Sequence, residues 1–160
     1  MKARPKLFRK SADGSVAVEM AVILPILLLF LAVPLFIARI FWFYSVGEKA
    51  AHDAARFLST ATQAEMRTPG GGFNEAKVAA VARWIAQQEL EEILPFTDGI
   101  IIDVQCNTGG CGAAVPNTVH VGVQTTLHDN ILGGMTSLYF GGTDLVLYSN
   151  VTMRYVGTGN

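Results

Sequence analysis

The sequence lacks the compact motifs that mark many enzymes. It has no His-Glu-x-x-His pair of zinc ligands and no Gly-x-Ser-x-Gly turn, and its run of three glycines is not followed by the Lys-Ser/Thr of a phosphate-binding loop. Its three histidines, His52, His120 and His128, form no recognisable catalytic or metal-binding pattern. We therefore expect no enzymatic activity, no metal and no cofactor. A catalytic group assembled from distant residues remains the alternative.

Charged residues are also scarce, at 16% of the sequence against 51% apolar residues, and the apolar excess is local. The segment Met20–Ala38 has no charged residue and would be ~28 Å long as a helix, close to the ~30 Å hydrocarbon core of a bilayer. The apolar character continues beyond it, and Trp42 and Tyr44 suit a membrane interface. We therefore expect a transmembrane helix over residues 15–44.

The charges are distributed asymmetrically along the chain. Residues 1–14 carry five bases and one acid, whereas residues 45–160 carry six bases and eleven acids. Because Lys and Arg mark the cytoplasmic flank of a span, we expect a cytoplasmic N-terminus and an exported remainder. An acidic exported part argues against binding to nucleic acid. A cleaved secretory signal is the alternative, although no small-x-small site closes the apolar run.

The exported part is expected to be an α+β domain that begins with more of the first helix. Apolar residues at three- and four-residue spacing extend this helix over residues 45–67, to about Met66. A Pro/Gly turn at residues 68–72 then separates it from the domain at residues 73–160. The extension's apolar stripe consists of Val46, Ala50, Ala54, Phe57, Leu58 and Ala61.

A second helix is expected between this turn and Pro95. Asn74 can cap its start, with Phe73 packing on Val78 as a hydrophobic staple. Trp84 lies off the inner stripe, where it can pack on the long helix. The inner face is predicted to contain Val78, Val81, Ala82, Ile85 and either Ile93 or Leu94.

Three later segments alternate between apolar and polar residues with the period of a β-strand: residues 100–106, 119–125 and 145–154. They predict a small antiparallel sheet of about three strands, with one packed face and one partly wet face. The segment Asp129–Phe140 has apolar residues at mixed spacing and is expected to form a short helix on the sheet.

The two cysteines, Cys106 and Cys111, lie in the exported part with four residues between them. An even count in an oxidising compartment indicates a disulfide, here across a loop between two strands. Two further zinc ligands are not evident. Two unpaired thiols are the alternative.

Two prolines, Pro25 and Pro34, interrupt the predicted span. Each removes a backbone donor and clashes with the carbonyl four residues earlier, so we expect helix kinks at these positions. Membrane helices tolerate such prolines where neighbours or water satisfy the freed carbonyls.

A short junction joins the basic leader to the apolar run. The leader ends at Gly14, Ser15 follows, and Glu19 is a single carboxylate just inside the apolar helix. A charge in that setting is costly and usually has a partner or a function. The simpler alternative is an interfacial Glu that is favoured near the positive helix end. The leader's bases are Lys2, Arg4, Lys6, Arg9 and Lys10.

This junction resembles the processing site of type IV prepilins and pseudopilins. The resemblance implies that prepilin peptidase cuts between Gly14 and Ser15, where a residue without a β-carbon lets the chain enter extended. Glu19 would then be the fifth residue of the mature chain. It could pair with the new amino terminus of a neighbouring subunit and set the axial register.

The resemblance narrows to TadE-like proteins. Residues 18–25 read Val-Glu-Met-Ala-Val-Ile-Leu-Pro, and residues 50–56 read Ala-Ala-His-Asp-Ala-Ala-Arg, which is similar to an alanine-rich stretch of that family. The family implies a minor pseudopilin that supports assembly of an adhesive tight-adherence (Flp) pilus. Its implied setting is the bacterial inner membrane, with other pilin-like subunits and inner-membrane assembly platform proteins as partners and the domain in the periplasm. An uncleaved, single-pass anchored periplasmic binding or scaffold protein is the alternative.

Overall fold

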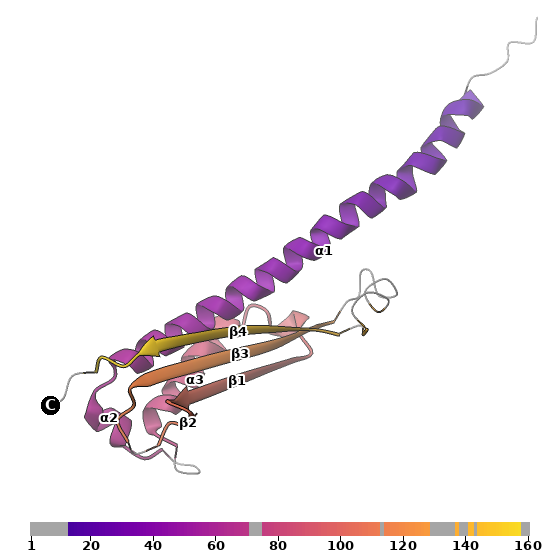
Figure 1. Ribbon diagram of the computed structural model, residues 1–160. Coiled ribbons are helices and arrows are strands. Elements are labelled where there is room, and N and C mark those ends of the chain that lie inside the picture. Colours follow the sequence, from indigo (N-terminus) through magenta and orange to yellow (C-terminus); the bar gives the residue numbers. More distant parts are fainter. Residues whose placement is uncertain are drawn as a thin grey trace, which may run out of the picture.

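A long helix that projects from a small α+β domain dominates the structure, a computed structural model (Figure 1). The described residues are 13–70, 75–112, 114–128, 137, 141–142 and 144–157. Along the chain they form α1, α2, α3, a 3-10 turn η1 (Leu94–Phe96), and strands β1 to β4. The predicted α+β class is therefore confirmed.

Helix α1 (Asp13–Thr60) is a single helix of 48 residues, about 72 Å long. Its side chains are exposed at every position from Val16 to Leu31, whereas the stripe that includes Ala50 and Leu58 is completely buried in the domain. The predicted change from an all-round apolar helix to a one-sided helix is thus confirmed. One continuous helix thus projects from the domain with its first part and packs into the domain with its last part.

The expectation that this helix runs to about Met66 is wrong, because a separate helix, α2 (Gln63–Arg67), follows Thr60. Thr62 caps α2: its hydroxyl accepts from the Glu65 amide at 3.3 Å, and its own amide donates to Glu65 Oε2 at 2.8 Å. This capping box supplies partners for amides that a new helix start leaves unpaired. The Thr62 amide, and the Thr62 hydroxyl that donates to the same carboxylate oxygen at 2.8 Å, lower the pKa of the Glu65 carboxyl.

Helix α3 (Lys77–Leu90) starts later than expected, after an Ala76 that makes no side-chain cap bond. The expected cap and staple residues, Asn74 and Phe73, lie outside the described residues. Trp84 is 58% exposed, so its expected packing on the long helix is wrong. Of the predicted inner face, Val78, Ala82 and Ile93 are buried as expected, whereas Val81 and Leu94 are exposed and Ile85 is half-buried. The buried stripe is rotated toward Ala79, Ala86 and Leu90.

The sheet is antiparallel with strand order β2-β1-β3-β4, one strand more than expected. The additional strand, β2 (Gly109–Gly110), forms a tight hairpin with β1 (Gly99–Cys106). The longest pairing joins β3 (Thr118–His128) to β4 (Asp144–Arg154) in register from Thr118–Arg154 to His128–Asp144. Within the segment Asp129–Phe140, where a short helix is expected, only Ser137 is among the described residues.

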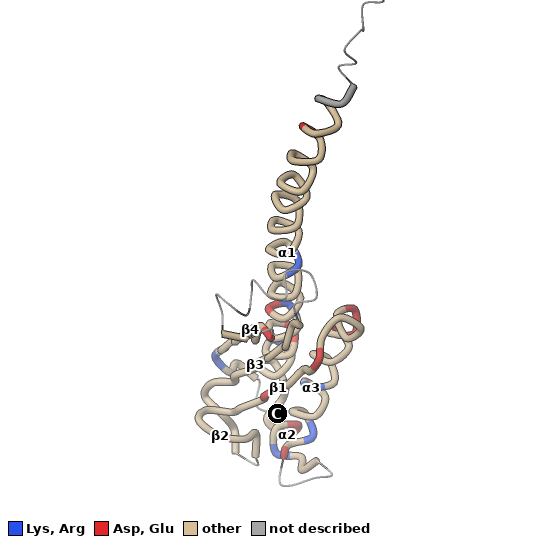
Figure 2. The backbone as a smooth tube through the Cα atoms, turned by 90° about the vertical axis from the view of Figure 1, so that its right-hand side faces the viewer, with Lys and Arg blue, Asp and Glu red and all other residues tan. Residues whose placement is uncertain are grey.

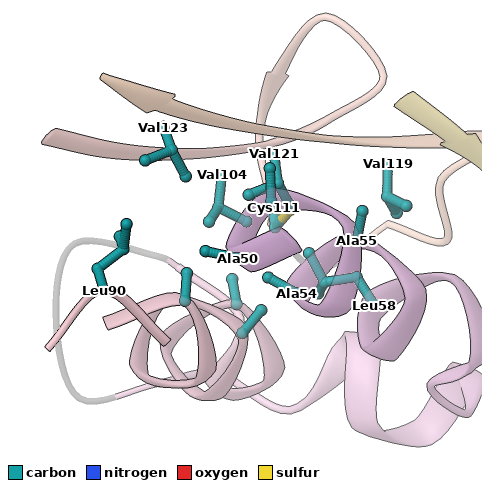
Figure 3. Close-up of a cluster of buried hydrophobic side chains, with 14 of the residues drawn as sticks. Ala50, Ala54, Ala55, Leu58, Leu90, Val104, Cys111, Val119, Val121 and Val123 are labelled. Carbon is teal, nitrogen blue, oxygen red and sulfur yellow. The ribbon is translucent and has the colours of Figure 1, made fainter. Parts of the chain in front are cut away.

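The core lies between one face of the sheet and the two helices α1 and α3 (Figure 3). Alanines on both helices are fully buried, and their short side chains let the two helices and the sheet approach closely. The sheet contributes mainly valines. The labelled residues in Figure 3 that meet in this core are Ala50, Ala54, Ala55, Leu58, Leu90, Val104, Cys111, Val119, Val121 and Val123.

Candidate functional site: the projecting half of the long helix

From Val16 to Leu31, helix α1 presents apolar side chains on all sides to its surroundings. Phe30 is 75% exposed, and every other large apolar side chain in this range is at least 51% exposed. A soluble domain rarely exposes a continuous apolar surface of this length. The length and composition of the helix are compatible with a single-pass membrane anchor.

Two charges bracket this apolar surface. Between Val16 and Gly47, Glu19 and Arg39 are the only charged residues, and they are twenty positions apart. At 1.5 Å per residue this separation is ~30 Å, the thickness of a bilayer's hydrocarbon core. In Figure 2 the helix between them carries neither acidic nor basic colour. The helix therefore offers one membrane-length segment with a charge at each end.

The predicted processing junction falls in the first turn of α1. Gly14 and Ser15 are in the helix; the side chain of Ser15 and the basic leader over residues 1–12 are outside the described set. Glu19 follows Ser15 by four positions and so lies on the same helix face, one turn further on. Its carboxylate is exposed, and no partner for it is found among the described residues of the chain. In a single copy, Glu19 is therefore available to a group from outside.

Helix α1 continues through both prolines without a break (Figure 1). Pro25 and Pro34 each lack an amide hydrogen, so the carbonyls of Ala21 and Phe30 lose their usual partner four residues on. All four of these residues are exposed. The kinks at these positions remain a prediction.

Where α1 enters the domain, Arg39 connects it to a distant corner that the sequence did not indicate. Its Nη2 donates to the carbonyl oxygen of Phe96 at 3.3 Å, and its guanidinium lies 5.6 Å from the ring centre of Phe43. The ring of Trp42 also lies 6.0 Å from that of Phe96. Because Phe96 lies 54 residues after Trp42, no local pattern could have paired them.

The alanine-rich stretch at residues 50–56 proves to be structural. Its four alanines are fully buried, while the side chains between them reach outward: His52 is exposed and Asp53 is half-buried. His52 Nδ1 lies 3.6 Å from Asp53 Oδ1, and both side chains are open to solvent. We therefore assign the stretch to packing of the domain rather than to chemistry.

The predicted disulfide is present: Cys106 and Cys111 are bonded, with their Cα atoms 4.7 Å apart. It closes the β1–β2 hairpin, whose turn places Asn107 at a positive φ of 59°. The carbonyl of Cys111 accepts from the Ala76 amide at 2.6 Å, which ties the hairpin to the start of α3. The bridge therefore holds an otherwise weak two-residue strand against the domain.

One cluster of potential metal ligands was missed by the sequence reasoning, because its members are distant in the chain. At one end of the sheet, His128 Nδ1 lies 2.6 Å from Asp144 Oδ1 and 3.8 Å from Asp98 Oδ2. The three potential ligand atoms lie within 4.8 Å of one another. The two carboxylate side chains are largely exposed, and the contacts to His128 account for their arrangement. The absence of a metal and of a cofactor stays a prediction.

The family described as TadE-like protein matches residues 14–56. This segment is TadE-like. The match covers the Gly14 junction, the exposed apolar half of α1 and the buried alanine-rich stretch, so the resemblance seen in the sequence is confirmed. It indicates a membrane-associated, pilus-related context. Comparison with curated proteins and with solved structures gave no match.

Proposed function

We propose that this TadE-like protein is a minor pseudopilin that supports assembly of an adhesive tight-adherence pilus. The observation that carries the proposal is the exposed apolar half of α1, which bears the single carboxylate Glu19 shortly after Gly14. Pilin-like subunits need such a helix twice, first as a membrane anchor and then as a packing surface in an assembly. The TadE-like match over residues 14–56 supports the same function.

The first step is maturation by prepilin peptidase between Gly14 and Ser15. This bond lies in the first turn of α1, where the amide groups lack partners within the helix. Unwinding one terminal turn therefore breaks few hydrogen bonds, and the chain can enter the protease in extended form. The absence of a β-carbon at Gly14 removes the main steric obstacle to that entry.

Cleavage would create an amino group at Ser15, on the same helix face as Glu19. In an assembly, the carboxylate of one copy can pair with the amine of a neighbouring pilin-like subunit, which offsets the cost of a charge in apolar surroundings. The small side chains of Ala17 and Ala21 allow neighbouring helices to approach closely. This pairing would set the axial register between subunits.

The α+β domain then has a structural rather than a catalytic role. With the N-terminus in the cytoplasm of a bacterium, the domain lies in the periplasm, where the Cys106–Cys111 bridge is stable. There it connects or caps the assembly above the inner-membrane platform proteins. The acidic balance of residues 45–160 favours protein and membrane partners over nucleic acid.

The deciding experiment is the mass of the mature N-terminus. We expect the chain purified from cells with active prepilin peptidase to lack residues 1–14, and the chain from peptidase-deficient cells to retain them. Gly14→Val should block the cut, whereas Ala21→Val, which adds the same bulk within the span, should leave it unchanged. An intact leader in both strains would reject the pseudopilin and favour an uncleaved single-pass scaffold. A start far beyond Ser15 would instead indicate a cleaved secretory signal.

A further inference from the structure

The corner between α3 and β1 exposes apolar side chains beside the point where α1 leaves its apolar segment. Leu94 and Phe96, both in the 3-10 turn η1 (Leu94–Phe96), are each 51% exposed. Next to Phe96, Trp42 of α1 is 41% exposed. Figure 1 shows the end of α3 and the start of β1 at the end of the domain that is nearer the N-terminal half of α1.

The contacts of Arg39 hold the corner between α3 and β1 beside the residue of α1 at which the apolar segment ends. Arg39 is the first charged residue after the apolar segment that begins beyond Glu19, so it marks where the helix leaves hydrocarbon. Its hydrogen bond to the Phe96 carbonyl holds η1 at the same level. In a bilayer spanned by α1, Phe96 would therefore lie at the membrane interface, where aromatic side chains are favoured.

The burial of side chains within the apolar segment independently places the domain-side boundary of the hydrocarbon core near the same point on α1. Phe36 is only 4% exposed, and Ala32 and Val33 before it are half-buried, so the protein covers one face of α1 inside the predicted span. Among the residues whose burial the structure describes, the stretch of α1 that is exposed on all sides is Val16–Leu31, which is ~24 Å long. A hydrocarbon core of ~30 Å therefore extends to the end of the domain.

We propose that η1 is a second membrane contact, with Leu94 and Phe96 inserted beside Trp42 into the phospholipid interface of the leaflet nearer the domain. Glu91, Glu92 and Asp98 flank the turn and are exposed, so only the two apolar side chains enter and the carboxylates stay in water. The domain would thus rest against the bilayer with a fixed tilt. This contact depends on membrane anchoring by α1 and not on cleavage or on a pilus.

Site-directed spin labelling tests the contact in the full chain. Single variants Leu94→Cys and Phe96→Cys carry a nitroxide, and the disulfide leaves no other free thiol. The protein is reconstituted alone into vesicles of phosphatidylethanolamine and phosphatidylglycerol, and label accessibility to lipid-soluble oxygen and to a water-soluble nickel chelate is measured. Val156→Cys is the matched control, because Val156 is 64% exposed and its amide bonds to Ser59 near the other end of the buried helix. Ile37→Cys is the reference within the span.

We expect the oxygen-to-nickel accessibility ratio at positions 94 and 96 to exceed that at 156 several-fold and to approach that at 37. Ratios at 94 and 96 equal to that at 156, with 37 still lipid-exposed, would overturn the proposal. Labels at 94 and 96 shielded from both reagents would overturn it too, because another protein copy would then cover the corner. The result is independent of the N-terminal mass, so either proposal can fail alone.

Discussion

Gly47 of α1 lies directly against Ser149 of β4: a β-carbon at position 47 would be 2.8 Å from Ser149 Oγ and 3.4 Å from its Cβ. Ser149 is only 3% exposed, so its hydroxyl has little room to move away. The missing side chain at Gly47 lets the long helix cross the edge strand at close range. This contact is one reason why the helix that leaves the span is held rigidly against the sheet.

Gly47→Ala is therefore expected to destabilise the domain, although alanine favours helix formation. The propensity gain is about 1 kcal/mol, and overpacking a filled core costs about 1–3 kcal/mol, so we expect a net loss of about 1 kcal/mol. In a Ser149→Ala background the nearest obstacle is gone, and the same substitution should stabilise. A double-mutant cycle of unfolding free energies in detergent micelles measures the difference. Equal effects in both backgrounds would contradict the contact.

The disulfide gives a second prediction. Because the bridge closes a short loop, Cys106→Ser should lower the unfolding free energy by about 1–3 kcal/mol. Wild type and variant are compared by thermal unfolding under oxidising conditions and again after reduction of the wild type. The two should converge on reduction. An unchanged melting temperature under oxidising conditions would show that the bridge does not contribute to stability.

The elements with strong periodicity were predictable from the sequence. The three long strands alternate, and the stripe from Val46 to Leu58 repeats at helical spacing, so pattern and structure agree. Strand β2 has only two glycines and no period to detect. The inner face of α3 was predicted only in part because alanines carry little hydrophobic signal, yet Ala79 and Ala86, which the pattern did not indicate, are completely buried.

The candidate site likewise has a part that could be predicted from the sequence and a part that could not. Gly14, Glu19 and the apolar segment are contiguous in sequence, so their chemistry could be inferred from order and spacing alone. The contact of Arg39 with Phe96 joins residues 57 positions apart and depends on how α3 folds back. The cluster around His128 likewise needs three segments to meet, which only the sheet register determines.

The α2 cap gives a prediction about pH. Hydrogen bonds from the Thr62 amide and hydroxyl favour the ionised form of Glu65 and lower its pKa in the folded state. Its stabilising contribution is therefore complete above the ordinary pKa of 4.5 and is lost as the pH falls through the folded value. Glu65→Ala should lower the melting temperature at neutral pH, and the gap to wild type should close on acidification.

Glu65→Gln is the matched control, because its amide oxygen can still accept from Thr62 but does not titrate. The gap in melting temperature between Glu65→Gln and Glu65→Ala should therefore stay constant with pH. If the gap between wild type and Glu65→Ala also stays constant, ionisation of Glu65 does not contribute to the cap.

The last prediction concerns the carboxylate that is proposed to set the register. Glu19→Ala and the isosteric Glu19→Gln should leave membrane insertion intact but lower several-fold the recovery of co-expressed pilin-like subunits by affinity purification. Glu19→Asp keeps the negative charge and should retain part of the partner recovery. The exposed domain residue Glu91, changed to Ala, controls for a general loss of negative charge.

A comparison in peptidase-deficient cells separates register pairing from a simple interfacial role for Glu19. Without prepilin peptidase no subunit gains a new amino terminus, so Glu19→Ala should cause no further loss of partner recovery in that strain. Additive losses would mean that Glu19 acts without the new amino terminus. Equal partner recovery by wild type and Glu19→Ala would remove the carboxylate from the assembly mechanism altogether.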